Sequence, residues 1–237
     1  MTTLSKDLRQ DLEEQFSIIP FEVTNVVEGE DSTKIWLQTT DGHIIELVIL
    51  YHWDTHEHDS QKSKVIKSIT SDDWLYGPDD FMDFTDDAWN KISSWKNKLN
   101  RITLCVSSQV GCPMNCLFCV TGKLGIKRNL TPEEIIWQVL YANNYIKKKF
   151  WKKDDGTLYG VRNVVFMGMG EPLLNYDNVK KAIELMLPQD RLSLSRRHIT
   201  ISTAGIIPWI RQLIKDEIPV KLAISLHAPN QALRDKL

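Results

Sequence analysis

The chain has 237 residues, enough for one large domain or for a large domain with a small one. Its composition, 42% hydrophobic and 25% charged, is ordinary for a globular protein. No run of about 18 apolar residues occurs and the N-terminal residues are polar, which excludes a membrane-spanning helix and a secretory signal. We therefore expect a cytoplasmic protein with no membrane partner.

Charge is distributed unevenly along the chain. Residues 1–100 contain 9 Lys or Arg and 20 Asp or Glu, whereas residues 101–237 contain 20 and 11. Such a split indicates two segments with different roles. The basic half can meet a polyanion, or the two halves can simply attract one another, and composition leaves both interpretations open.

The acidic half contains few clear elements. Apolar residues recur at helical spacing between Leu4 and Phe16. Residues 33–51 predict a β-hairpin around Asp41-Gly42, a strong signal for a two-residue turn. Residues 52–100 show no repeat and suggest one helix over 87–99, so they are treated as an insertion or linker.

In the basic half, short apolar strands alternate with helices. We expect strands at 102–108, 163–167, 198–202 and 220–226, and helices at about 132–149, 177–187 and 207–216. Thr131-Pro132-Glu133-Glu134 is a capping box that fixes the start of the first helix. The alternation indicates a parallel sheet covered by helices, with four β/α units visible. Because a closed barrel needs more units, we expect the chain to be cut short at its C-terminus.

The four cysteines, Cys105, Cys112, Cys116 and Cys119, lie close together in the sequence. This clustering indicates metal or redox chemistry rather than a disulfide scaffold. The last three form a C-x3-C-x2-C motif directly after the first strand of the β/α series. Three thiolates on one loop can hold three irons of a [4Fe–4S] cluster and leave the fourth iron open to another ligand.

A structural zinc site is the alternative for these cysteines. Closed zinc sites use four ligands, usually as two pairs. The spare thiol, Cys105, lies on the preceding strand, and the nearest histidine group, His52, His56 and His58, is distant in the sequence. The spacing therefore favours the iron–sulfur cluster.

Four segments carry a resemblance to a known family: TLCVSSQVGCPMNCLFCVTGKLGIKRNLTPEEI, NVVFMGMGEPLLNYDNV, ITISTAGIIP and LAISLHAPN. They resemble the RlmN/Cfr family of radical S-adenosylmethionine (SAM) RNA methyltransferases, and within it the RlmN branch. The resemblance implies an α/β fold, a partial (β/α)6 radical SAM barrel preceded by a small α+β segment. Residues 1–51 would be a remnant of the N-terminal accessory domain plus the hairpin, and residues 101–237 the incomplete radical SAM core.

The resemblance also implies cofactors and their ligands. Cys112, Cys116 and Cys119 would hold a [4Fe–4S] cluster, and the Glu171 carboxylate would take the α-ammonium group of SAM. The carboxyl ends of the strands in a β/α fold surround one common site, and the implied SAM contacts lie at such strand ends. Without the resemblance, each of these residues is equally well explained as part of a tight turn or as a polar residue that caps a buried strand. The implied contacts are Gly170, Glu171, Ser202, Ser225, Leu226 and His227.

The activity implied by the family is methylation of C2 of adenosine in 23S rRNA and in a tRNA anticodon loop. A first SAM methylates a cysteine, a second gives the radical that activates this methyl group, and another cysteine releases the adduct through a disulfide bond. Cys105 matches the releasing cysteine and Glu46 the candidate proton acceptor. The methyl-carrying cysteine is expected beyond Leu237, so we expect no complete methyl transfer by these residues alone. A flavodoxin or ferredoxin would donate electrons.

Two other functions remain open: a radical SAM enzyme with a small-molecule or peptide substrate, and a non-catalytic RNA- or zinc-binding module. Three basic clusters bear on the RNA interpretation. Lys123, Lys127 and Arg128 follow the cysteines and can bind phosphates. Lys147–Lys153 lies at a helix end, where cations favour the helix dipole and are more often simply solvated. Arg196-Arg197-His198 precedes the third strand.

Overall fold

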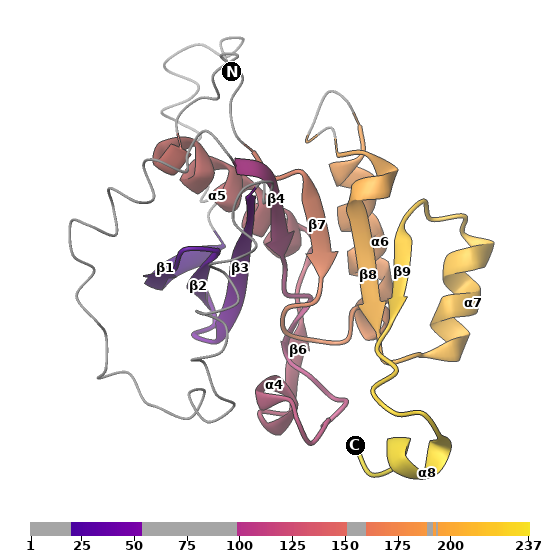
Figure 1. The fold of residues 1–237 in the computed structure, drawn as a ribbon. Coiled ribbons are helices and arrows are strands. Elements are labelled where there is room, and N and C mark those ends of the chain that lie inside the picture. The colour runs from indigo at the N-terminus through magenta and orange to yellow at the C-terminus, as the bar shows by residue number, and fades with distance from the viewer. Residues whose placement is uncertain (1–19, 54–98, 151–159, 189–191, 193) are drawn as a thin grey trace, which may run out of the picture.

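The computed structural model describes residues 20–53, 99–150, 160–188, 192 and 194–237. Seven strands form one sheet in the order β1-β2-β3-β4-β7-β8-β9, and β5 and β6 form a separate ribbon (Figure 1). The strands are β1 (Phe21–Glu28), β2 (Ser32–Thr39), β3 (Ile44–Trp53), β4 (Leu99–Cys105), β5 (Gln109–Gly111), β6 (Ile126–Asn129), β7 (Asn163–Phe166), β8 (Ile199–Thr203) and β9 (Lys221–Ile224).

The strands β1 to β4 pair antiparallel. The predicted hairpin is therefore part of the main sheet, where β3 pairs with β4, the first strand of the β/α series. The turn of the hairpin is longer than expected. Thr39 N donates to His43 O at 2.8 Å and Gly42 N donates to Thr39 O at 2.9 Å, which leaves three residues in the loop. Gly42 has a φ of +83°, the left-handed conformation that closes such a loop.

The strands β4, β7, β8 and β9 pair parallel, as predicted. The connecting helices are α5 (Pro132–Phe150), α6 (Tyr176–Met186) and α7 (Ile207–Lys215), close to the predicted ranges. The capping box is confirmed, because the Glu134 carboxylate accepts from Thr131 N at 2.8 Å and Thr131 Oγ1 accepts from Glu134 N at 3.3 Å. The alternation of apolar strands and helices therefore gives the expected α/β architecture.

The two faces of the sheet differ in burial. The face packed against the helices is apolar, with Ile49, Leu104 and Phe166 among its buried side chains. Along β3 buried and half-buried residues alternate, which places Glu46 on the opposite face. This opposite face, called the inner face here, also carries Cys105 and Ser202. In Figure 1, α5 and α6 lie behind the parallel strands.

Shorter elements surround the ends of the parallel strands. They are α4 (Val120–Lys123), η4 (Pro172–Asn175), η5 (Arg196–His198) and α8 (Gln231–Arg234). None of the helices in the described ranges is long and apolar enough to cross a membrane. Three predictions fall outside the described residues: the helix over 4–16, the histidines His56 and His58, and the helix over 87–99 apart from Leu99. The division at residues 51 and 100 stays a prediction.

Candidate cluster- and SAM-binding site

The three motif cysteines lie on a loop that is fixed at both ends. The loop leaves the β5–β6 ribbon at Cys112, whose N–H donates to Gly125 O at 3.1 Å, and enters α4 at Cys119, whose N–H donates to Cys116 O at 3.0 Å. Asn115 has a φ of +50°, a left-handed residue at the bend. The Cys112–Cys119 segment, the cysteine loop, therefore presents its thiols from one short stretch of backbone.

Two glycines let the backbone fold closely around this loop. A Cβ atom on Gly111, which has a φ of +77°, would lie 1.8 Å from Gly125 O. A Cβ on Gly122 would lie 3.0 Å from Cys116 N. Any larger residue would push the ribbon or α4 away from the cysteines, so these glycines shape the loop.

All four cysteines are free thiols, so the disulfide expected from the family is absent from the structure. Burial raises the pKa of Cys112, and the neighbouring Cys119 and Cys116 thiols raise it further. Within the described ranges, no three His, Cys, Asp or Glu side chains converge to hold a single metal ion. Three thiols on one loop are nevertheless the donor set that a cluster with three protein ligands requires.

Beneath the cysteine loop lies a buried polar network that the sequence analysis did not find. Gln138 of α5 accepts from Ser107 N at 2.9 Å and donates to Ser107 O at 3.0 Å. Ser107 Oγ donates to Glu46 O at 2.6 Å, and Asn175 Nδ2 donates to Ser108 O at 2.7 Å. The only sequence signal is the polar Ser-Ser-Gln run between a buried strand and the first motif cysteine. The network ties β3, α5 and η4 to the segment that leads into the loop.

Gly170 and Glu171, the implied SAM contacts after β7, pack against this same segment. A Cβ on Gly170, which has a φ of +107°, would lie 2.7 Å from both Gln109 Cβ and Ser108 Oγ. The glycine therefore allows contact between two protein segments. The buried Glu171 carboxylate accepts from Leu173 N at 3.0 Å and from Ala204 N at 2.8 Å, which links β7 to the end of β8.

The remaining implied SAM contacts gather at the ends of β8 and β9. Ser202 Oγ lies 3.2 Å from Ser225 Oγ, and Ser225 N donates to Thr203 O at 2.8 Å. The His227 ring lies 4.6 Å from the Phe118 ring of the cysteine loop, centroid to centroid. Leu226 is 60% exposed. The structure thus brings residues more than 80 positions apart to one end of the sheet.

Cys105 and Glu46 lie on the inner face of β4 and β3. Cys105 pairs with Val48, so Glu46 is displaced from it by two residues along the neighbouring strand. Burial first, and the charge of Glu46 in addition, raise the pKa of Cys105 to about 11. Glu46 also forms an ion pair with Lys34 at 2.8 Å.

The phosphate-binding role expected for Arg128 is not supported. Its guanidinium binds the Asp41 carboxylate at 2.6 Å and the Glu134 carboxylate at 2.8 Å, so both of its sides already hold anions. Lys123 and Lys127 of the same cluster are exposed. Arg128 instead fastens the hairpin turn, β6 and the start of α5 to one another.

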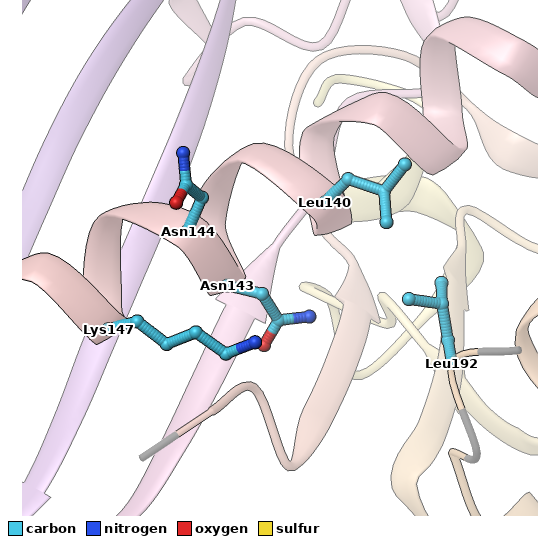
Figure 2. A pocket seen from close by; sticks show the side chains of 5 residues that line it. All are labelled: Leu140, Asn143, Asn144, Lys147 and Leu192. Carbon is cyan, nitrogen blue, oxygen red and sulfur yellow. The ribbon is translucent and has the colours of Figure 1, made fainter. Parts of the chain in front are cut away.

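A hollow of about 360 Å³ lies on the outer helix layer and contains none of the implied site residues. Figure 2 shows Leu140 pointing toward Leu192 across it, with Lys147 beside Asn143. Asn143 is already engaged, because its Oδ1 accepts from Val161 N at 2.9 Å. The hollow is lined by Leu140, Asn143, Asn144, Lys147 and Leu192.

Comparison with known proteins shows which proteins this chain is similar to. The family model of the Radical SAM superfamily matches residues 106–237. The chain is 39% identical over 240 residues to a probable dual-specificity RNA methyltransferase RlmN from Dictyoglomus thermophilum, covering 100% of this chain and 53% of that protein. It is 39% identical over 244 residues to the dual-specificity RNA methyltransferase RlmN from Psychrobacter arcticus, covering 100% and 49%.

A solved structure agrees with these relatives. The crystal structure of a radical SAM methyltransferase from Sphaerobacter thermophilus superposes with a TM-score of 0.71 at 31% identity, covering 100% of this chain and 54% of that one. The chain thus spans about half the length of the curated relatives it matches. Together with the cysteine loop between β5 and α4, these similarities show that the chain belongs to the radical SAM superfamily, within which it is similar to dual-specificity RNA methyltransferases RlmN.

Proposed function

We propose that this chain is the cluster- and SAM-binding core of a methyltransferase that acts on C2 of adenosine in 23S rRNA and tRNA. The observation that carries the proposal is the junction between the cysteine loop and the strand ends. Phe118 of the loop contacts His227 after β9, and Gly170 after β7 packs on Gln109 just before the loop. A ligand at this end of the sheet would meet the cysteines and all four parallel strands.

The superfamily uses a [4Fe–4S] cluster and SAM. Cys112, Cys116 and Cys119 would hold the cluster, which supplies the electron for reductive cleavage of SAM when it is bound. The close backbone packing at Gly111 and Gly122 keeps the loop that carries the three cysteines compact. Three cysteines satisfy three irons and leave one position open for SAM.

The residues around the strand ends would bind and orient SAM. Each oxygen of Glu171 accepts one backbone N–H and retains lone pairs for a further donor, such as the α-ammonium group. The Ser202 and Ser225 hydroxyls face each other at 3.2 Å and can turn toward a ligand hydroxyl. Gly170, Leu226 and His227 would complete the surface.

Cys105 and Glu46 would act on the RNA side of the reaction. The Cys105 thiol is protonated at neutral pH, because burial raises its pKa to about 11. It therefore needs a base before its sulfur can attack the sulfur atom that holds the covalent protein–RNA adduct, which would form an S–S bond and break the bond from that sulfur to the RNA-bound carbon, with the electron pair leaving on the RNA side. Glu46 is a carboxylate on the same inner face, and we assign it the acceptor role for a proton in this step.

We also propose substrates and partners for the whole protein, since the two RlmN relatives are about twice as long as this chain. RNA as the substrate is supported by the similarity to two RNA methyltransferases. A flavodoxin or ferredoxin would supply electrons, and the cytoplasm would be the site of action.

Anaerobic reconstitution with iron and sulfide tests the cofactor assignment. We expect about four irons per chain and release of 5′-deoxyadenosine from SAM under reduction. Substituting any one of Cys112, Cys116 and Cys119 with Ala should abolish both, whereas Cys105→Ala should leave the iron content unchanged. One zinc and no iron per chain would contradict the proposal.

The RNA assignment needs a separate assay on the protein extended to the length of its relatives. With labelled SAM and a 23S rRNA fragment or tRNA, we expect 2-methyladenosine in the digested RNA. A superfamily enzyme with a small-molecule substrate would cleave SAM but would neither methylate RNA nor respond to it. That outcome would retain the radical SAM core and reject the RNA function.

A further inference from the structure

Four exposed cations lie at the end of the sheet opposite the cysteine loop. Arg101 lies in β4, Arg162 directly precedes β7, Arg197 lies in η5 two residues before β8, and Lys221 begins β9. Because these four strands are neighbours and run parallel, their starts meet at one edge. We call the four residues the cation edge. In Figure 1 the starts of β4, β7 and β8 lie at the end of the sheet away from α4.

His198, which directly precedes β8, lies at the same edge of the sheet as the four cations. Burial first, and then the charges of Arg162, Lys221, Arg197 and Arg101, lower the pKa of His198. Burial first, and then the charge of Arg101, lower the pKa of His52, where the charge of Asp31 acts in the opposite direction. The edge is therefore strongly positive, with a carboxylate at one side.

These cations are not used by ion pairs among the described residues. The pairs found there use other cations: Lys34, His43, Arg128, Lys149 and Lys180. Exposed, mutually repelling cations cost free energy unless an anion is bound. An external anion would remove this repulsion.

The base of the edge is rigid. A row of hydrogen bonds crosses the inner face: His52 Nε2 lies 3.0 Å from Thr103 Oγ1, Asn163 Nδ2 donates to Thr103 Oγ1 at 3.1 Å, and His198 Nδ1 lies 2.5 Å from Asn163 Oδ1. The row joins β3, β4, β7 and the start of β8. It fixes the strand starts relative to one another, and with them the spacing of the cations.

We propose that the cation edge binds the phosphate backbone of the RNA substrate, at a contact separate from the reaction site. Four neighbouring strand starts span roughly 14 Å, at about 4.8 Å per strand. Cations spread over that length can each meet a different phosphate of one strand. Three of the four cations are arginines, whose planar guanidinium groups pair with phosphate oxygens in a bidentate way.

The position of the edge limits which RNA it can contact. It is separated from the cysteine loop by the length of the parallel strands, about five residues or roughly 16 Å. An RNA that reaches the reaction site and the edge at once must extend past the whole length of the parallel strands, and a complete tRNA offers helices beyond its anticodon stem–loop for this second contact. This inference rests on the proposed RNA function and adds a second contact that selects large folded substrates.

The test compares two variants that each lose three exposed cations. The edge variant carries Arg101→Gln, Arg162→Gln and Arg197→Gln, and the control variant carries Lys148→Gln, Lys181→Gln and Arg211→Gln on the helix layer. Fluorescence anisotropy measures the binding of a complete tRNA transcript and of its anticodon stem–loop alone, at several salt concentrations. Thermal unfolding and iron content check that both variants fold.

For the tRNA, the edge variant should bind at least about tenfold more weakly at low salt, and its log–log salt slope should fall by about 2 to 3. For the stem–loop, the affinities of the edge and control variants should differ by less than about twofold. Equal losses in edge and control variants, or equal losses on both RNAs, would overturn the inference while leaving the RNA function intact. If the protein extended to the length of its relatives bound neither RNA, the RNA function itself would fail. Should the triple variant unfold, Arg162→Gln and Arg197→Gln singly should each lower the slope by about 0.7 to 0.9.

Discussion

The Glu46 carboxylate and the Cys105 thiol occupy the same face of two hydrogen-bonded strands, with Glu46 two residues from the strand partner of Cys105. Burial is the main cause of the high Cys105 pKa, about 11, and the charge of Glu46 adds to it. Lys34 partly neutralises that charge through an ion pair at 2.8 Å. Three residues on three adjacent strands thus control when the thiol becomes a nucleophile.

This relationship predicts opposite effects of two substitutions on thiol reactivity. Glu46→Gln removes a negative charge and should lower the Cys105 pKa, so alkylation at pH 9 should be about two- to threefold faster. Lys34→Gln leaves Glu46 unneutralised and should slow the reaction. Peptide mass spectrometry after iodoacetamide treatment follows Cys105 alone. Equal rates in the parent and both variants would contradict the electrostatic link.

The central role of Arg128 predicts unequal coupling to its two carboxylates. Glu134 has a 7% exposed side chain whereas Asp41 has a 43% exposed one, so solvent screens the second pair more strongly. Arg128→Gln should lower the free energy of unfolding by about 2 kcal/mol. Double-mutant cycles in urea with Glu134→Gln and Asp41→Asn should give the larger coupling for Glu134. A larger coupling for Asp41 would show that burial does not set the strength of these pairs.

Asp41 also predicts a pH dependence. Hydrogen bonds from Arg128 and Thr39 hold the Asp41 pKa well below its ordinary value. A depressed pKa in the folded state stabilises the fold above the pKa of the unfolded chain, about 3.9, and this stability is lost as the pH falls below it. Between pH 6 and pH 3 the parent should therefore lose more stability than Asp41→Asn does, as measured by urea unfolding at each pH. Parallel curves would contradict this contribution.

What the sequence could predict depended on the distance between interacting residues. The parallel strands, their helices and the Thr131–Glu134 capping box follow from patterns within a few positions, and the structure confirms them. The strand β1 was missed, because a bulge between Val23 and Asn25 breaks its alternation. Arg128 was assigned to phosphates because one of its carboxylate partners, Asp41, lies 87 residues away.

The site shows the same limit. Motif spacing was sufficient to select the three cysteines, and a family resemblance to select the strand-end residues. The close approach of Gly170 to Gln109 could not be predicted, because the two residues are far apart in the sequence. The Ser107–Gln138 bonds join residues 31 positions apart and leave no local pattern.

Gly170→Ala tests whether this close approach shapes the site. The added Cβ would lie 2.7 Å from Gln109 and would require a residue with a Cβ at φ +107°. Gly42→Ala is the matched control, since Gly42 has a φ of +83° but nothing within 4 Å of the added atom. Backbone strain alone should cost each variant about 1–2 kcal/mol, and Gly170→Ala should lose more and should also bind less iron on reconstitution. Similar losses in both variants would mean that the contact with Gln109 adjusts freely.

Gln138→Leu tests the buried network beneath the cysteine loop. The substitution keeps the approximate volume of the fully buried Gln138 but removes both hydrogen bonds to the backbone of Ser107. Leaving a buried N–H and a buried C=O without partners should lower the free energy of unfolding by about 2–4 kcal/mol. Gln38→Leu removes one exposed hydrogen bond, to Gly42 O at 3.3 Å, and should cost less than about 0.5 kcal/mol. Because Ser107 leads into the loop five residues before Cys112, Gln138→Leu should also accelerate loss of iron from the reconstituted protein. A variant with lowered stability and unchanged iron retention would show that the network supports the fold without positioning the cysteines.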